Sequence, residues 1–135
     1  MDVTNDASVN HAVQQTLDRA GRIDVVINNA GIAAQGITEA YTVEQFQQLL
    51  LLDVNLLGVA RVNRAVLPAM RRQHTGLLIH VSSGIGRIVI PECAAYAASK
   101  FALEALADGY RFELAPLGID SVIVEPGIHR TPILE

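Results

Sequence analysis

The stretch His80-Val-Ser-Ser-Gly-Ile-Gly-Arg-Ile-Val-Ile-Pro-Glu-Cys-Ala-Ala-Tyr-Ala-Ala-Ser-Lys100 contains the end of a predicted strand and the start of a predicted helix. The apolar residues 77–81 run into two serines and a glycine, the pattern of a buried strand followed by a turn. The alanine-rich run that follows favours a helix, and it carries Tyr96 and Lys100. Residues four apart on a helix lie on one face, so the sequence predicts that these two side chains are neighbours.

Proton transfer is the chemistry open to a tyrosine that lies beside a lysine. A free tyrosine has a pKa of about 10, and bringing it to neutrality requires about 4 kcal/mol of preference for the phenolate. One ammonium group at about 4 Å supplies roughly that much at an effective dielectric of about 20. Lys100 is the only lysine in the chain, although lysine and arginine together number 10. Ser83, at the end of the strand, could hydrogen-bond the oxygen that gains or loses the proton. An ordinary amphipathic helix with a half-buried tyrosine and a solvated lysine is the alternative, because this spacing is common.

Composition and charge restrict the class of protein. At 135 residues and 50% hydrophobic, the chain is long enough for one domain or part of one. A net charge of -4 argues against a nucleic-acid-binding surface. No apolar run reaches membrane-spanning length, the first residues do not resemble a signal peptide, and the four histidines lack metal-ligand spacing. The single cysteine, Cys93, excludes an internal disulfide and fits a reducing compartment. We therefore expect a cytoplasmic protein without a metal site, a membrane partner or a nucleic-acid partner.

The order of elements predicts a parallel α/β fold. The expected elements are a helix over 9–20 capped by Ser8 or Asp6 and ended by Gly21, a strand over 23–27, a loop over 32–41, a helix over 42–72 that Pro68 kinks or shortens, a strand over 77–81, a helix over 94–114 and a strand over 119–124. The uniformly apolar residues 25–27 indicate a strand covered on both faces, as parallel sheets require. Alternating strands and helices of this kind are joined by right-handed crossovers.

Three unusual turns fall at the carboxyl ends of the predicted strands, where ligands bind in such sheets. They are residues 28–31, 82–84 and 126–127. Glycine lets a backbone approach a ligand closely, and asparagine offers both a donor and an acceptor. Each turn alone is typical of ordinary loops, but all three on one edge beside Tyr96 and Lys100 favour a binding site.

These residues resemble the short-chain dehydrogenase/reductase family, of the compact type. The resemblance covers essentially the whole chain in order and spacing, and its matches are Asp2-Val3, Asn28-Asn29-Ala30-Gly31, Asn55 with Gly58, Ser82-Ser83, Tyr96 with Lys100, and Pro126-Gly127 with Thr131. It implies a Rossmann-type parallel sheet with helices on both faces, which binds NAD or NADP. The implied reaction is reversible hydride transfer between the cofactor and an alcohol or carbonyl substrate.

The resemblance also implies a role for each matching residue. Tyr96 would be the catalytic acid or base and Ser83 would hold the substrate oxygen, so these two would bind the substrate. Lys100 would lower the pKa of Tyr96 and bond the nicotinamide ribose, and Asn55 would anchor a water that links Lys100 to solvent. The remaining implied cofactor contacts are Asp2 and Val3 to the adenine, Asn28, Ala30 and Gly31 to the adenosine-side ribose region, and Pro126, Gly127, Ile128 and Thr131 around the nicotinamide carboxamide.

The chain also departs from the family pattern. The glycine-rich loop that cradles the pyrophosphate is absent, and Gly84-Ile85-Gly86 follows a different strand and lacks a third glycine. The family's final strand and substrate-binding helices are absent as well. Residues 1–135 therefore look like one partial domain, lacking the first two strand–helix units and the C-terminal segment. We expect the strand over 23–27 to have an exposed edge, and the isolated chain to bind NAD(P) weakly or not at all.

Alternative functions remain open at this point. The chain could be a non-catalytic fragment that acts by pairing with a full-length relative. An extended-type epimerase or dehydratase shares the Tyr-x-x-x-Lys pair, but residues 28–31 and Asn55 disfavour it. The two long helices over 42–72 and 94–114 resemble those of the family's dimer interface and predict a homo-oligomer. Ile88, Ile90 and Pro91 hint at an apolar alcohol, ketone or steroid-like substrate, and the choice between NAD and NADP is not encoded in this stretch.

Overall fold

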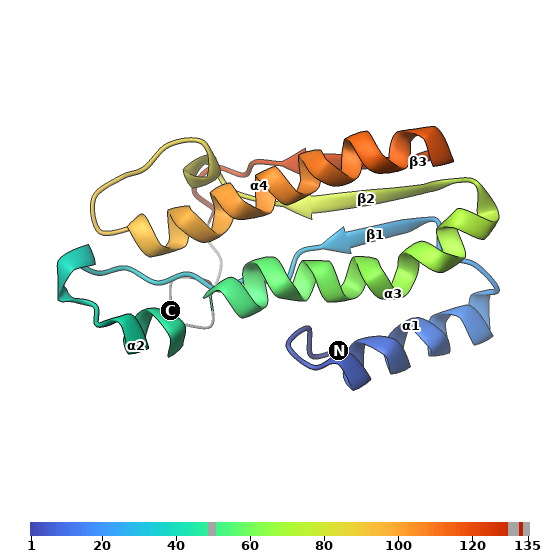
Figure 1. Cartoon of the computed structure of the whole chain (residues 1–135), viewed down its shortest axis with the longest axis horizontal. Coiled ribbons are helices and arrows are strands. Elements are labelled where there is room, and N and C mark those ends of the chain that lie inside the picture. Colours follow the sequence, from blue (N-terminus) through green and yellow to red (C-terminus); the bar gives the residue numbers. More distant parts are fainter. Residues whose placement is uncertain (49–50, 130–132, 134–135) are drawn as a thin grey trace.

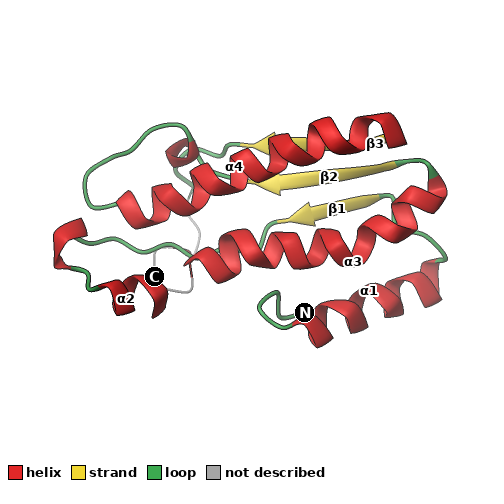
Figure 2. Cartoon of the chain, viewed as in Figure 1, coloured by secondary structure: helices red, strands yellow, loops and turns green. Residues whose placement is uncertain are grey.

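The computed structural model describes residues 1–48, 51–129 and 133, without the side chains of 47 and 48. Three parallel strands form one sheet in the order β1-β2-β3, with β1 at Val25–Asn28, β2 at Gly76–Val81 and β3 at Ile119–Val124. Three long helices lie alongside the sheet (Figure 1): α1 (Asp6–Ala20), α3 (Gly58–Gln73) and α4 (Ala94–Leu114). The short helix α2 (Val43–Gln48) lies beyond the carboxyl ends of the strands (Figure 1, Figure 2). The predicted parallel α/β fold is confirmed.

The core lies between the sheet and the long helices. Alternate strand residues face this layer, and Leu78, His80, Ile119 and Ser121 are buried to 4% exposure or less. The main apolar cluster consists of Val9, Val13, Ile23, Val62, Val66, Leu67, Met70, Leu78, Leu114 and Ile119. Because residues from all three long helices share this cluster, these helices cover the same face of the sheet.

The opposite face of the sheet carries apolar side chains that the described residues leave uncovered. Val25 is 48% exposed, Ile27 61% and Val122 42%. The parallel register places Val25 beside Leu77, Ile27 beside Ile79, and Ile79 in turn beside Val122, so these side chains line one face. The expectation that residues 25–27 are covered on both faces, with helices on both faces of the sheet, therefore holds for one face only within residues 1–48 and 51–129. The apolar pattern indicates that both faces of the strand favour burial, but the described residues supply no layer that covers the second face.

Strand β1 also forms one edge of the sheet. In the described part of the chain it pairs with β2 alone, through the register from Val25–Leu77 to Asn28–His80. The predicted exposed strand edge is confirmed.

The first helix begins earlier than expected. Asn5, in an extended conformation, caps α1 by accepting a hydrogen bond at 3.0 Å from the Ser8 backbone amide, so the predicted start at residue 9 with Ser8 or Asp6 as cap is wrong. Gly21 ends the helix with φ 74 and donates to the Leu17 carbonyl, as predicted.

The segment predicted as one helix over 42–72 is helical on both sides of a short gap in the described residues. α2 spans Val43–Gln48, residues 49–50 lie outside the described residues, and a π-helical turn over Asp53–Leu57 leads into α3. Pro68 lies within α3 on its exposed side, and the helix continues to Gln73, so the proline does not shorten it. Proline has no backbone N–H, so the carbonyl four residues before it lacks its helical hydrogen bond. On the exposed side of the helix, water can bind that carbonyl, which lowers the energetic cost of a proline there. None of the helices in the described residues is long and apolar enough to cross a membrane.

Candidate functional site

Three of the four predicted catalytic residues meet where β2 ends against α4. Ser83 follows β2, and its side chain lies close enough to Tyr96 to lower the pKa of the Tyr96 hydroxyl. Lys100 lies one turn further along α4, with its Nζ 5.8 Å from the centroid of the Tyr96 ring. Nζ donates a hydrogen bond of 2.9 Å to the Val81 carbonyl, and Lys100 is 4% exposed. The helical spacing and the strand end therefore bring the predicted proton-transfer group together.

Asn55 occupies the π-helical turn before α3 and is 1% exposed. Its Oδ1 accepts from the Ile32 backbone amide at 2.9 Å, and its Nδ2 donates to the Ile32 carbonyl at 2.9 Å and to Ser99 Oγ at 3.0 Å. Both amide hydrogens are thus in use. The side chain fixes the loop after β1 against α4, and its implied role in anchoring a water stays a prediction. Single π turns inside helices are frequent at functional sites.

Burial dominates the titration of both groups on α4. It lowers the pKa of Lys100 from 10.5 to about 8, and the negative charge of Glu104 acts in the opposite direction. Burial also raises the pKa of the Tyr96 hydroxyl, which the hydrogen bond with Ser83 partly counters. Lys100 is not among the groups that shift the pKa of Tyr96 in this arrangement, so its implied role in lowering that pKa stays a prediction. The Lys100 ammonium is instead hydrogen-bonded to the Val81 carbonyl.

A cavity of about 100 Å³ opens beside the carboxyl end of β1. It is lined by Met1, Val3, Val26, Ile27, Asn28, Asn29, Ala30, Val54, Gly58, Val59 and Val62. Three predicted cofactor contacts, Val3, Asn28 and Ala30, are in this lining. Gly58 lets the first residues approach closely, because a Cβ at this position would lie 2.8 Å from Val3 Cγ2.

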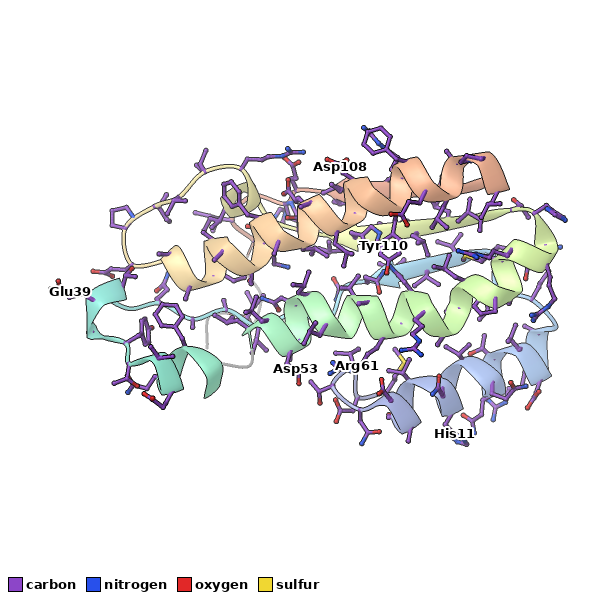
Figure 3. All side chains as sticks on the ribbon, in the orientation of Figure 1. His11, Glu39, Asp53, Arg61, Asp108 and Tyr110 are labelled. Carbon is purple, nitrogen blue, oxygen red and sulfur yellow. The ribbon has the colours of Figure 1, made fainter. Side chains whose placement is uncertain are left out.

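Arg61 connects two segments that line the cavity, the first residues of the chain and the π-helical turn. Its guanidinium forms an ion pair of 2.7 Å with Asp53, and it also donates to the Val3 carbonyl at 3.3 Å. Figure 3 shows Arg61 on α3, facing the start of α1, where Asp6 lies 3.4 Å away. The N-terminal segment and the π-helical turn are therefore joined through one side chain.

Two predicted contacts in the N-terminal part have other partners. Asp2 is exposed and is not in the cavity lining, and its Oδ1 accepts from the backbone amide and the hydroxyl of Thr4 at 2.9 and 2.8 Å. These two hydrogen bonds lower the pKa of Asp2. Asn28 is 7% exposed, and its Nδ2 donates to Asn63 Oδ1 at 2.9 Å and lies 3.4 Å from His80 Nδ1. The amide group of Asn28 is directed into the core, so a ligand contact would have to use its backbone.

Gly31 lies between the cavity and the side chains of Asn55 and Lys100. A Cβ at this position would lie 3.4 Å from Asn55 Oδ1 and 3.6 Å from Lys100 Nζ, so the backbone passes directly over both side chains. This contact joins the turn after β1 to the π-helical turn and to α4.

The third predicted turn follows β3. The Pro126 carbonyl accepts a hydrogen bond of 3.1 Å from the Gly84 amide, which places this turn against the Ser83 turn. Gly127 and Ile128 are exposed, Ile128 to 99%, and the described residues give them no contact in the site. Thr131 lies outside the described residues.

Several residues at the site were missed in the sequence. Ser99 donates to the Tyr96 carbonyl at 2.7 Å and accepts from Asn55, which ties the catalytic helix to the π-helical turn. Glu104 is buried beside Ser82, and its position four residues after Lys100 was the available signal. Val54, Val59 and Val62 line the cavity, and their placement around Asn55 and Gly58 on one helical face could have identified them.

Comparison with known proteins gives the same result along the whole chain. The sequence profile of the family described as short chain dehydrogenase matches residues 1–135. A 3-ketodihydrosphingosine reductase from Bacteroides thetaiotaomicron is 40% identical over 131 residues, which are 97% of this chain and 48% of that protein.

Solved structures agree with the sequence match. A short-chain dehydrogenase from Streptomyces avermitilis matches with a TM-score of 0.89 at 38% identity, over 98% of this chain and 48% of that chain. A gluconate 5-dehydrogenase from Burkholderia cenocepacia, in complex with NADP and tartrate, matches with a TM-score of 0.90 at 32% identity, over 98% of this chain and 51% of that chain. This chain spans about half the length of the relatives it matches, which agrees with an incomplete Rossmann-type fold. The chain belongs to the short-chain dehydrogenase family.

Proposed function

We propose that this chain carries the proton-transfer group of an oxidoreductase that interconverts an alcohol and a carbonyl compound with NAD or NADP. The observation that supports the proposal is the meeting of Ser83, Tyr96 and Lys100 beside Asn55 at the carboxyl edge of a parallel sheet. In this family the same residue types in the same order serve that reaction. The relative from Burkholderia cenocepacia holds NADP, and the reductase from Bacteroides thetaiotaomicron is named for reduction of a ketone.

The residues present fit a dinucleotide along this edge. The cavity beside β1 has mostly apolar walls from Val3, Ala30 and Val54, which suit a flat aromatic base. From this cavity the turn at Gly31 leads to Lys100 and Tyr96, and the turn at Gly127 offers exposed backbone. When bound, the nicotinamide would supply or accept the hydride.

The proton follows a separate route through the residues of this chain. The Ser83 hydroxyl would donate a hydrogen bond to the substrate oxygen, and the Tyr96 hydroxyl would exchange a proton with that oxygen. Lys100 would stabilise the phenolate that forms, because an ammonium in a buried site acts strongly on a nearby negative charge. The raised pKa of Tyr96 suits it to donate a proton to a carbonyl oxygen in the direction of reduction.

Turnover of a full-length version, followed through the absorbance of the reduced cofactor with a panel of ketones and alcohols, tests this proposal. Tyr96→Phe should abolish turnover, because it removes the hydroxyl that carries the proton. Tyr110→Phe is the matched control, since it removes a hydroxyl from the same helix away from the site. Equal activity of the wild-type protein and Tyr96→Phe would show that the acid/base assignment is incorrect.

A second candidate function is a non-catalytic fragment that pairs with a full-length relative. The uncovered apolar face of the sheet favours it, as do Phe101 and Phe112, which are 43% and 71% exposed on α4. Size-exclusion chromatography of the chain with such a relative distinguishes the two functions. A shared peak without intrinsic reductase activity would support the fragment, and separate peaks would remove it.

Three further properties belong to the same proposal. We infer one partial domain over residues 1–135, self-association through the segments 42–72 and 94–114, and a cytoplasmic location. Exposed apolar side chains at Leu52 and Leu57 in the first segment and Phe112 in the second support the self-association. The lone cysteine and the acidic composition support the location.

A further inference from the structure

A buried carboxylate, Glu104, lies one helical turn beyond Lys100 on α4. Glu104 is 4% exposed on α4, and its Oε1 accepts a hydrogen bond of 2.7 Å from Ser82 Oγ. Ser82 directly precedes Ser83, so this bond fastens the end of β2 to the catalytic helix. Burying a carboxylate costs free energy unless the carboxylate has hydrogen-bond or charged partners, so the partners of Glu104 indicate what it does here.

The turn after Ser83 folds over the same carboxylate. Arg87 Nε lies 2.7 Å from Glu104 Oε2, but its hydrogen is directed to Glu125 Oε1 at 2.8 Å, so Oε2 has no hydrogen-bond partner among the described residues. Gly86 packs directly on the pair, since a Cβ there would clash with Glu104 Oε1 and lie 2.6 Å from Ser82 Oγ. The carboxylate is therefore in contact with β2, the turn and α4 together, with a charge that Arg87 only partly compensates.

The same carboxylate is one helical turn after Lys100 on α4. Residues four apart on a helix share a face, and Glu104 is the charged group that favours the ammonium form of Lys100 against its burial. Lys100 lies beside Tyr96 on the same helix, whereas the charged group in contact with Glu104 is Arg87, which also pairs with Glu125 after β3. Burial alone would push Lys100 towards its neutral form at physiological pH.

We propose that Glu104 is a positioning residue that fastens the turn of Ser82–Arg87 to α4 and keeps the Lys100 ammonium charged. The proposal depends on the proposed function only for the use that catalysis makes of Lys100. The contacts of Glu104 with Ser82, Gly86 and Arg87 exist whether or not the chain turns over a substrate.

The titration of Lys100 tests the electrostatic part without any turnover. Because the chain has a single lysine, isotope-labelled lysine gives one side-chain NMR signal, whose pH midpoint can be followed in the protein as it is. Glu104→Gln keeps an oxygen that can accept from Ser82 and removes the charge. Its midpoint should fall by about one pH unit relative to the wild-type protein. Glu113→Gln makes the same charge change at an exposed position of α4 and should leave the midpoint unchanged.

An unchanged midpoint in Glu104→Gln would overturn the proposal. If this variant does not fold, Arg87→Gln decides, because Arg87 is exposed and its loss leaves the charge of Glu104 less compensated. The midpoint should then rise, and a constant or lower midpoint would overturn the proposal.

Hydrogen exchange tests the mechanical part. Glu104→Ala removes the acceptor of Ser82 and should speed exchange at the Gly86 amide, which Glu104→Gln should leave close to the wild-type rate. Equal exchange in all three proteins would show that Glu104 does not hold the turn. In a full-length version, the pH above which turnover is lost should be lower in Glu104→Gln than in the wild-type protein, which would link the residue to catalysis. Inactivity of the wild-type full-length protein would instead count against the proposed function alone.

Discussion

Acid should weaken this fold through a single buried histidine. His80 is 0% exposed on β2, with its Nε2 3.1 Å from Ser121 Oγ and its ring stacked on Tyr110 at 6.1 Å between centroids. Burial lowers the pKa of His80 from 6.5 to about 4, because no anion in its surroundings compensates the imidazolium.

The sign and size of the effect follow from linkage. The pKa of the folded state lies below that of the unfolded state, so between about pH 6.5 and 4 the unfolded chain binds the proton first. Stability from the neutral histidine is complete above pH 6.5 and is lost as the pH falls towards 4. A difference of about 2.5 units corresponds to about 3 kcal/mol in the free energy of unfolding. This is a large part of the marginal stability of a small domain.

Urea unfolding followed by circular dichroism measures this effect at a series of pH values. Carboxylates titrate in the same range, so the quantity of interest is the difference between the wild-type protein and His80→Gln. The variant should lose about 3 kcal/mol less than the wild-type protein on acidification. His11→Gln, at an exposed position of α1, is the control and should follow the wild-type curve. Parallel plots of unfolding free energy against pH for the wild-type protein and His80→Gln would show that His80 does not weaken the fold in acid.

Three further predictions concern other parts of the structure. The pKa of Lys100 is lowered in the folded state to about 8, so the unfolding free energy should rise by about 3 kcal/mol between pH 8 and 10.5 and should lack this rise in Lys100→Met, as urea titrations at alkaline pH would show. Asn55→Ala removes the hydrogen-bond partner of the part-buried amide and carbonyl of Ile32 and should cost about 1–3 kcal/mol in the same assay, whereas a cost near zero would mean that water replaces the side chain. Ile27→Lys places a charge on the uncovered sheet face and should reduce self-association in light scattering while stability stays nearly constant, and a large loss of stability would show that this face is covered in solution.

The meeting of Ser83, Tyr96 and Lys100 was predictable because it depends on short-range geometry. Tyr96 and Lys100 are separated by one helical turn. Ser83 follows an apolar run whose end at two serines and a glycine is typical of a buried strand followed by a turn. The parallel order of the strands followed from the alternation of apolar runs with helical segments. Each of these inferences needs only the period of an element and its terminal residues.

Other features depend on partners far away in the sequence. The burial of Asn28 requires Asn63 on α3 and His80 on β2, and nothing in the turn of Asn28 distinguishes an inward amide from one that faces a ligand. The π-helical turn at Asn55 keeps a helical apolar pattern, so a continuous helix was the simpler expectation. The electrostatic effect of Lys100 on Tyr96 depends on where Nζ finds its partner, here the Val81 carbonyl.

The uncovered sheet face marks another limit of the sequence. An apolar strand such as Val25–Asn28 shows that both faces tend to be buried, but it does not show which segment buries them. The relatives are about twice as long as this chain, and the family order of strands gave the exposed edge correctly.

The central claim is that the Tyr96 hydroxyl transfers the proton beside Ser83 and Lys100. Single-turnover reduction of a ketone by a full-length version, at saturating reduced cofactor, separates this step from binding. We predict that Tyr96→Phe slows this step by about 10²–10⁴-fold while the Kd for the cofactor stays within a few-fold of the wild-type value. A single-turnover rate equal to that of the wild-type protein would contradict the account.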